Sequence, residues 1–309
     1  MNLAPLEEQA FEGGEFKLRP LDSVRNRPVI VLQSLVATPA TTIADSLVRL
    51  LFLLNGLRDA GACERIALIP YLAYARMDRR TELRDPINAR YVAQLLEASG
   101  ATRMITLDVH NPAALDNAFR IPVDHLTALP MMAHWFADRV GTAALAVVSP
   151  DIGGVKRAQL FQESLEQQLG RGVEFALLEK RRSSGNAATG RLLGDLAGRD
   201  AIVVDDLCAT GGTLIHAAEK CREAGARAVH VAVSHTPWAA GLSAVLSSGS
   251  INQVLTTDSV GSLQGVPAEF RSKLVTLSVA PLFGGVVRRI VEGNPVGPLL
   301  TRWPVPDGE

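Results

Sequence analysis

The sequence predicts an α/β fold with two similar, doubly wound domains built on parallel sheets. Short apolar segments rich in β-branched residues alternate with longer helical segments along most of the chain, and this alternation is typical of parallel sheets covered by helices on both faces. The pattern runs twice, once before about residue 127 and once after about residue 143. A chain of 309 residues is also longer than one hydrophobic core usually supports, since domains of about 150 residues are common.

The expected strands are short, apolar and bounded by turn residues. They lie at Val29 to Leu32, Ile66 to Ile69, Met104 to Leu107, Leu145 to Val148, Phe175 to Leu178, Ile202 to Val204 and Val229 to Val233. Helices are expected where a Gly follows a helix-period segment as a stop signal: Thr42 to Ala60, Ile87 to Ser99, Val155 to Leu169 and Leu214 to Ala224. Another helix is expected over Gly284 to Glu292, followed by an extended, proline-rich tail.

We expect residues 1–127 to form the first domain and residues 128–283 to form the second. Residues 122–130, which begin and end with proline, are the expected crossover between the two domains. The C-terminal segment 284–309 is expected to pack back on the first domain.

The charge balance argues against partners that are recruited by a global electrostatic field. The chain carries 31 Lys and Arg against 32 Asp and Glu, and its net charge of -1 would not attract nucleic acid or an anionic membrane. Its apolar runs are shorter than a membrane span and its acidic N-terminus is unlike a signal peptide, so we expect a cytoplasmic protein.

Cys63, Cys208 and Cys221 lack the spacing of a disulfide framework or a zinc site, and Cys208 is expected to fill space rather than act as a nucleophile.

Residues 200–214 combine an apolar strand, two adjacent carboxylates and a Thr-Gly-Gly-Thr loop. The loop lies where the strand gives way to a helix, and backbone N–H groups at a helix start bind phosphate while glycines let the backbone approach it. Asp205 and Asp206 would accept hydrogen bonds from two vicinal sugar hydroxyls or hold a hydrated Mg²⁺. This combination suits a phosphorylated ribose, and the structural alternative is an Asp-Asp turn before an ordinary Gly-rich helix start.

Three arginines, Arg76, Arg79 and Arg80, lie within five residues of one another in the loop after the second expected strand. Arginine forks suit phosphate oxygens and also stack on flat bases, so this loop suits a nucleoside triphosphate. The structural alternative is a solvated basic turn balanced by Glu82 and Asp85.

Two further strand ends carry groups that bind metal ions or phosphates. Asp108 and His110 come at the end of the third expected strand, on the same rim as the arginines, and Asp151 comes after the fourth. Since Mg²⁺ prefers oxygen ligands and usually keeps its waters, His110 would contact the ion or its water shell. The alternatives are a hydrogen-bonded structural His110 and an Asp151 that caps the following helix.

Lys180, Arg181 and Arg182 lead into a small, polar stretch that is typical of a mobile loop. A loop with these cations would close over a transferring phosphoryl group and neutralise the charge that develops there. The alternative is a charged hairpin exposed to solvent.

In this order and spacing, the motifs resemble those of the ribose-phosphate diphosphokinases, also called phosphoribosyl-pyrophosphate synthetases. The resemblance covers most of the chain and rests on Phe11-Glu-Gly-Gly-Glu15, Gln33-Ser34, Tyr74-Ala-Arg-Met-Asp-Arg79, Asp108-Val-His110, Ser149-Pro-Asp-Ile-Gly-Gly154, Lys180-Arg-Arg182 and the sugar loop. Phosphoribosyltransferases share only the last of these motifs, because a transferase has no need of a second, nucleotide-binding rim.

The resemblance implies two type I phosphoribosyltransferase-like domains and a transfer of the diphosphoryl group of ATP to the anomeric hydroxyl of ribose 5-phosphate. The residues implied in ATP binding are Phe11, Glu15, Arg76, Asp78, Arg79 and His110, of which Phe11 and Glu15 would reach the adenine of a neighbouring subunit in a homo-oligomer, a dimer or a hexamer. Those implied in ribose 5-phosphate binding are Asp151, Asp205, Asp206, Ala209, Thr210, Gly211, Gly212 and Thr213. His110 and Asp151 would hold Mg²⁺, and Lys180 and Arg182 would be the catalytic cations.

The chain departs from the family pattern at Ala209, where the family has a third acid, at Gly13, where it usually has Asp, and at Met77, where it usually has Gln. Ala209 removes an acceptor near the ribose or the metal, and Met77 lacks the donor and acceptor of an amide. The chain also begins ten residues before Phe11, so a smaller first sheet or a truncated start is expected. Two alternative functions remain, a non-catalytic regulatory homologue and a phosphoribosyltransferase.

Overall fold

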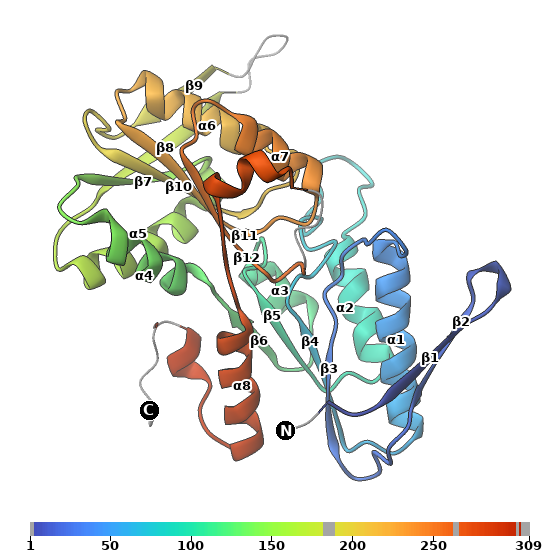
Figure 1. Cartoon of the computed structure of the whole chain (residues 1–309). Coiled ribbons are helices and arrows are strands. Elements are labelled where there is room, and N and C mark those ends of the chain that lie inside the picture. Colours follow the sequence, from blue (N-terminus) through green and yellow to red (C-terminus); the bar gives the residue numbers. More distant parts are fainter. Residues whose placement is uncertain (1–2, 182–188, 262–265, 301–302, 304–309) are drawn as a thin grey trace. The chain divides into compact units, whose positions relative to one another are not determined.

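The computed structural model describes residues 3–181, 189–261, 266–300 and 303. The chain divides into two compact units, Met1–Leu126 and Thr127–Glu309. Each unit contains a parallel sheet with helices beside it, as Figure 1 shows. The predicted α/β class with parallel sheets is therefore confirmed.

The first unit has a four-stranded parallel sheet whose strands follow one another in chain order: β3 (Pro28–Leu32), β4 (Glu64–Ile69), β5 (Arg103–Leu107) and β6 (Val123–Leu126). The connecting helices are α1 (Ile43–Asp59), α2 (Asn88–Ala98) and α3 (Pro112–Ala118). Side chains start two of them, since Thr42 forms a capping box with Asp45 at α1 and Asn111 accepts a hydrogen bond from Ala114 N at α3. The last residues of β4 and β5 are buried on both faces, which explains their continuous apolar sequence.

A hairpin precedes this sheet and packs on α1. Its two antiparallel strands are β1 (Leu6–Ala10) and β2 (Phe16–Pro20). The Phe16 and Phe52 ring centroids lie 5.6 Å apart, and the Arg49 guanidinium lies 4.5 Å from the Phe16 centroid. Arg49 also forms an ion pair with Glu8 of β1. The hairpin is thus fixed to the helix by an aromatic contact and by a shared arginine.

The second unit has a seven-stranded sheet in the order β13-β12-β11-β10-β7-β8-β9, in which β8 and β9 pair antiparallel and the other pairs are parallel. The strands are β7 (Leu145–Ser149), β8 (Glu174–Arg181), β9 (Thr189–Leu193), β10 (Asp200–Leu207), β11 (Ala228–His235), β12 (Gln253–Thr257) and β13 (Leu274–Leu277). The α-helices are α4 (Leu129–Val140), α5 (Val155–Leu169), α6 (Gly212–Glu223), α7 (Ala239–Ser247) and α8 (Ala280–Glu292).

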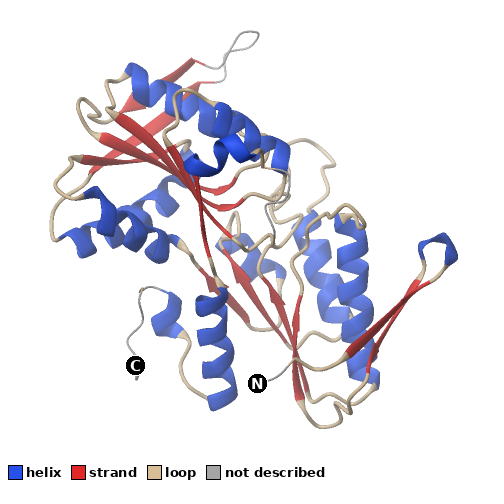
Figure 2. Cartoon of the chain, viewed as in Figure 1, coloured by secondary structure: helices blue, strands red, loops and turns tan. Residues whose placement is uncertain are grey.

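Helices cover both faces of this second sheet (Figure 2). On one face, Ala201 and Val203 of β10 belong to a buried cluster that includes residues of α6 and α7. On the other face, Phe136 of α4 packs edge to face against Phe161 of α5 and His230 of β11, with ring centroids 6.0 and 5.8 Å apart. The second unit is therefore doubly wound around β10 and β11.

Several elements were not expected from the sequence. Residues 122–130, expected as a crossover, contain β6 and the start of α4. β8 continues beyond the expected end at Leu178 because its last residues pair with β9. Part of the expected extended tail forms a short 3-10 helix, Gly297–Leu300. The domain limits and the packing of segment 284–309 on the first domain remain predictions.

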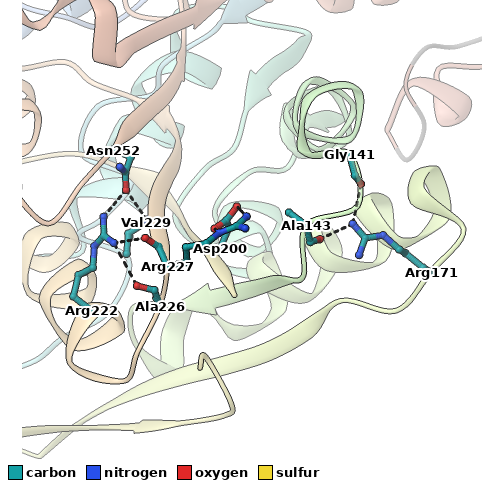
Figure 3. A network of polar contacts seen from close by, with 9 residues as sticks. All are labelled: Gly141, Ala143, Arg171, Asp200, Arg222, Ala226, Arg227, Val229 and Asn252. Atoms are coloured by element: carbon teal, nitrogen blue, oxygen red, sulfur yellow. Dashed lines mark hydrogen bonds and ion pairs between the residues drawn. The ribbon is translucent and has the colours of Figure 1, made fainter. Parts of the chain in front are cut away.

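Hydrogen bonds from polar side chains connect the segments at the amino-terminal ends of the strands in the second sheet (Figure 3). Arg227 donates two hydrogen bonds of 2.8 and 2.6 Å to the carboxylate of Asp200, the first residue of β10. Arg222 donates to the carbonyls of Ala226, Arg227 and Ser250 and to the side-chain oxygen of Asn252. These contacts close the turn between α6 and β11 and link it to the start of β12.

Removing the Arg222 guanidinium should destabilise the fold without changing the chemistry. We expect Arg222→Met to lower the free energy of unfolding by about 1–3 kcal/mol, because several backbone carbonyls lose a charged donor. Urea unfolding would measure the loss, and kcat and KM should stay within about twofold of wild type, a change of under about 0.5 kcal/mol. Arg288→Met on an exposed position of α8 is the matched control and should leave the stability unchanged.

Candidate active site

The sugar loop of the second unit lies between the carboxyl end of β10 and the start of α6. Asp205 and Asp206 are among the last residues of β10, and α6 begins at Gly212. The first N–H groups of a helix have no partner within the helix, and the helix dipole is positive at this end. The structure therefore has the strand, acid pair and helix start in the order that phosphate binding requires.

Two glycines set the backbone path of this loop. Gly211 has a φ of +83°, and a Cβ atom there would lie 2.7 Å from Val245 Cγ2 and 2.8 Å from the Gly241 carbonyl oxygen of α7. A Cβ atom on Gly241 would in turn overlap the carbonyl oxygen of Ala209. The first turn of α7 thus packs directly on the loop. Sequence reasoning identified Gly211 but did not identify Gly241.

A single guanidinium holds both carboxylates of the acid pair. Arg157 Nη1 lies 2.8 Å from Asp205 Oδ1, and Arg157 Nη2 lies 3.1 Å from Asp206 Oδ1. The three side chains are 13%, 15% and 6% exposed, respectively, so water screens this contact little. The same Asp205 oxygen accepts a hydrogen bond of 2.9 Å from Asp206 N. Arg157, in the first turn of α5, was not among the predicted site residues.

One positive charge does not balance two buried carboxylates. Burial, followed by the neighbouring charge of Asp206, raises the pKa of Asp205 to about 8, although Arg157 opposes the shift. The protonated form of Asp205 is therefore favoured in the folded chain far above the usual pKa of an aspartate.

Asp151 and the glycines after it are arranged as a helix cap. Asp151 Oδ1 accepts a hydrogen bond of 3.0 Å from Gly154 N, and Ser149 Oγ donates to the Asp151 carbonyl oxygen at 2.7 Å. A Cβ atom on Gly154 would lie 3.0 Å from Ser149 Oγ and 3.6 Å from Arg157 Nη1. The capping interpretation of Asp151 is thus confirmed, and the tight neighbour of a Cβ atom at Gly154 would be Ser149 Oγ rather than Arg157.

Among the predicted catalytic cations, Lys180 lies in β8, where it pairs with Gly190 of β9. Arg182 lies outside the described residues. Cys208 is buried at 1% exposure, and burial raises the pKa of its thiol to about 12. A thiol with so high a pKa is a poor nucleophile, which agrees with the space-filling role expected for Cys208.

In the first unit, hydrogen bonds tie together the loops that follow β4 and β5. Asn111 Nδ2 donates to Asp78 Oδ2 at 2.7 Å. Val109 N donates to Nε2 of His125 in β6 at 3.0 Å. Asp108 is 5% exposed and adopts a φ of +38°, whereas His110 is exposed to solvent. Asp78 and His110 are therefore on one rim, and His125, which the sequence did not single out, holds that rim in place.

The arginines of the β4 loop face solvent. Arg76 and Arg79 are exposed, and neither forms an ion pair within the part of the chain that the structure describes. The Asp85 carboxylate accepts hydrogen bonds from Thr81 and from Glu82 N, which lower its pKa, while Arg80 donates to the Asp85 carbonyl oxygen. Arg76 and Arg79 are thus accessible to an anionic ligand.

Phe11 and Glu15 flank the tip of the β1–β2 hairpin. Phe11 is 45% exposed, and its N–H donates to the Glu15 carbonyl oxygen at 2.7 Å. Gly13 and Gly14, between them, have φ values of +86° and +91°. The hairpin presents an apolar ring and a carboxylate to solvent at its outer end.

Two profiles of known domains match the chain. The N-terminal domain of ribose phosphate pyrophosphokinase matches residues 1–100, and the phosphoribosyl transferase domain matches residues 124–252. The ribose-phosphate pyrophosphokinase of Caldanaerobacter subterraneus subsp. tengcongensis is 38% identical over 303 residues, which cover 97% of this chain and 91% of that protein. The chain belongs to the ribose-phosphate pyrophosphokinase family.

Other members of this family agree in sequence and in fold. The ribose-phosphate pyrophosphokinase of Hyphomonas neptunium is 34% identical and covers 98% of this chain, which covers 93% of that protein. The crystal structure of phosphoribosylpyrophosphate synthetase from Mycobacterium smegmatis superposes with a TM-score of 0.81 at 31% identity, covering 95% of this chain and 92% of that one. Within the described residues, the helices are all too short or too polar to span a bilayer.

Replacing Asp205 should stabilise the folded chain at neutral and alkaline pH. Between the usual pKa of 3.8 and the raised value of about 8, the folded state binds a proton that the unfolded state has released, so stability falls as pH rises through this range. We expect Asp205→Asn to have a higher Tm than wild type at pH 8 and a similar Tm near pH 4. Thermal unfolding from pH 4 to 9 would measure this.

Asp195→Asn is the control for the sign of this effect. The Ala197 N–H and then Arg199 lower the pKa of this exposed carboxyl, so its replacement should not raise the Tm at pH 8. An Asp205→Asn variant whose Tm at pH 8 equals that of wild type would contradict the charge imbalance.

Adding a methyl group to Gly241 should disturb the loop at Ala209. We expect Gly241→Ala to raise the KM for ribose 5-phosphate by about tenfold or more, since small displacements of a binding group are costly. Steady-state kinetics would measure this increase. Gly284→Ala on α8, where a Cβ atom meets nothing within 4 Å, is the matched control and should leave KM unchanged.

Proposed function

We propose that the chain transfers the diphosphoryl group of ATP to the anomeric hydroxyl of ribose 5-phosphate, giving 5-phosphoribosyl 1-diphosphate and AMP. The observation that carries this proposal is the acid pair Asp205 and Asp206 held beside the Thr210 to Thr213 loop, in a family member that also has an arginine-rich second rim. An acceptor site for a phosphorylated ribose and a donor site for a nucleotide are both needed for such a transfer.

The sugar loop is assigned to the acceptor. Backbone N–H groups of the loop and first turn of α6, at Thr210 to Thr213, bind the 5-phosphate, with Ala209 at the start of the loop. Asp205 and Asp206 accept hydrogen bonds from the ribose hydroxyls. Asp151, at the end of β7, binds at the same edge of the sheet because β7 and β10 are neighbours.

The rim of the first unit is assigned to the donor. The exposed guanidinium groups of Arg76 and Arg79 contact the phosphates of ATP, and Asp78, oriented by Asn111, contacts the nucleotide. His110 follows β5 on the same rim. Met77, where the family usually has Gln, is 44% exposed and packs against the base without offering an amide.

The protein contributes mainly position and charge to this reaction. Phosphoryl transfer passes through a loose, in-line transition state, so cations that meet the developing negative charge lower the barrier. Lys180 and Arg182 supply these cations. Transfer forms the bond between the anomeric oxygen and the β-phosphorus and breaks the bond from that phosphorus to the α–β bridging oxygen, which leaves with AMP.

Mg²⁺ is the metal that this chemistry requires. It usually binds through one or two carboxylates together with waters and substrate phosphates, and the residues that the structure describes contain no cluster of three or more candidate ligands. Asp151 fits this mode, since its carboxylate lies at the binding edge and has more acceptor sites than one cap occupies. His110 suits a contact through the water shell better than direct binding, because Mg²⁺ prefers oxygen. When bound, Mg²⁺ neutralises the phosphates.

A homo-oligomer, a dimer or a hexamer, would complete the ATP site. The exposed Phe11 and Glu15 at the tip of the hairpin reach the adenine of a neighbouring subunit, and the contacts of Phe16, Phe52 and Arg49 hold the hairpin for this purpose. The enzyme acts in the cytoplasm.

The decisive assay follows AMP release from ATP in the presence of ribose 5-phosphate and Mg²⁺. We expect AMP and 5-phosphoribosyl 1-diphosphate in equal amounts. Saturable ATP binding without AMP would favour the non-catalytic homologue, and pyrophosphate release from 5-phosphoribosyl 1-diphosphate and a base would favour the phosphoribosyltransferase. The exposed arginines of the second rim favour the diphosphokinase over the transferase.

Removing the β8 cation should slow the reaction more than it weakens binding. We expect Lys180→Ala to lower kcat at least about a hundredfold, by analogy with the loss of one transition-state donor, with a small change in KM. Steady-state kinetics would separate the two constants. Lys220→Ala, in the last turn of α6, is the control, and near-wild-type turnover of Lys180→Ala would refute the assigned role.

A further inference from the structure

Arg157 connects two motifs that belong to different strands of the second sheet. Its side chain begins in the first turn of α5, shortly after the Ser149 to Gly154 segment that follows β7, and ends at the carboxylates of β10. The positions of the acid pair and of the cap at Asp151 are therefore coupled through one side chain.

The two terminal nitrogens of the Arg157 guanidinium, Nη1 and Nη2, contact different carboxylates. Contacts of 2.8 and 3.1 Å to Asp205 Oδ1 and Asp206 Oδ1 fix the spacing between two groups that would otherwise repel each other. A lysine ammonium has no such planar fork and would not fix this spacing in the same way. Asp205 Oδ1 accepts from both Arg157 and Asp206 N. A carboxylate has about four acceptor sites, so Asp205 keeps capacity for a sugar hydroxyl.

The surroundings also indicate a dedicated place for this side chain. The helix that carries Arg157, α5, starts directly after the short 3-10 helix Ile152–Gly154, and Asp151 caps that 3-10 helix through its hydrogen bond with Gly154 N. A polar group that is 13% exposed and meets two carboxylates is costly to reorganise, so the arrangement is rigid.

We propose that Arg157 is a positioning residue for ribose 5-phosphate, which holds Asp205 and Asp206 as a pre-formed pair of acceptors for two vicinal hydroxyls of the sugar. This inference deepens the proposed function and rests on it. Because one cation already lies between the two carboxylates, the pair is a receptor for neutral hydroxyl groups rather than a site for Mg²⁺. Of the two interpretations that the sequence left open for these acids, the geometry favours the sugar.

The test is calorimetric titration of ribose 5-phosphate into the full-length protein saturated with Mg²⁺ and α,β-methylene ATP. We expect Arg157→Gln to bind ribose 5-phosphate about 10- to 100-fold more weakly, the effect of losing charged hydrogen bonds, and to bind the ATP analogue as wild type does. Arg157→Lys should recover only part of the affinity, because the charge returns without the fork.

Arg227→Gln is the matched control, since it removes an arginine–aspartate pair at the opposite end of β10. If Arg157→Gln does not fold, Arg157→Lys, which keeps the positive charge and both carboxylates, is the test and should bind ribose 5-phosphate more weakly than wild type. Wild-type affinity for ribose 5-phosphate in a folded Arg157 variant would overturn the inference. A wild-type protein that binds the ATP analogue but never ribose 5-phosphate would instead count against the proposed function.

Discussion

Two adjacent carboxylates at the end of a buried strand are the constraint on which the second unit depends. Asp205 and Asp206 follow four fully buried residues of β10, so they are carried into a region where water screens their charges poorly. Arg157 reduces the repulsion between the two carboxylates but does not remove it. The pKa of Asp205 is therefore raised by burial and by the remaining effect of the Asp206 charge. Arg157 reaches the acid pair from the first turn of α5.

The amino-terminal and carboxyl ends of the strands in the second sheet differ in their chemistry. At its amino-terminal edge, Arg222, Arg227, Asp200 and Asn252 satisfy one another and the nearby carbonyls (Figure 3). At its carboxyl edge, the acid pair shares one cation and a helix start faces the ligand side. Polar groups that have all their hydrogen-bond and charge partners within the protein stabilise the fold. Polar groups that lack some of these partners can bind a ligand that supplies them. In the first unit, Arg76 and Arg79 are exposed in the loop that follows the carboxyl end of β4.

The sequence predicted the fold class, the strands that carry the motifs and the order of those motifs, because buried parallel strands have an unmistakable apolar pattern. It did not predict β6, β9, β12 and β13 or the hairpin β1–β2, which are short or partly polar and so lack the continuous apolar pattern of a buried strand. Arg157 follows the Ser149 to Gly154 motif closely in the sequence, but the sequence alone does not show that its side chain turns towards β10. Gly241 and His125 were missed for a similar reason, since each acts on a loop that is adjacent only in the folded chain.

The packing of α7 on the sugar loop has a consequence for protein engineering. The carbonyl of Ala209 occupies the place of a side chain at Gly241, and Gly211 rests on Val245. The loop therefore has no shape of its own that could be transplanted as a short peptide. A unit that keeps this packing must reach from the loop at least to Val245 and include β11, because the chain returns through β11 to α7, which packs on the loop. A graft of the Thr-Gly-Gly-Thr segment alone would carry the residues of the phosphate site without its geometry.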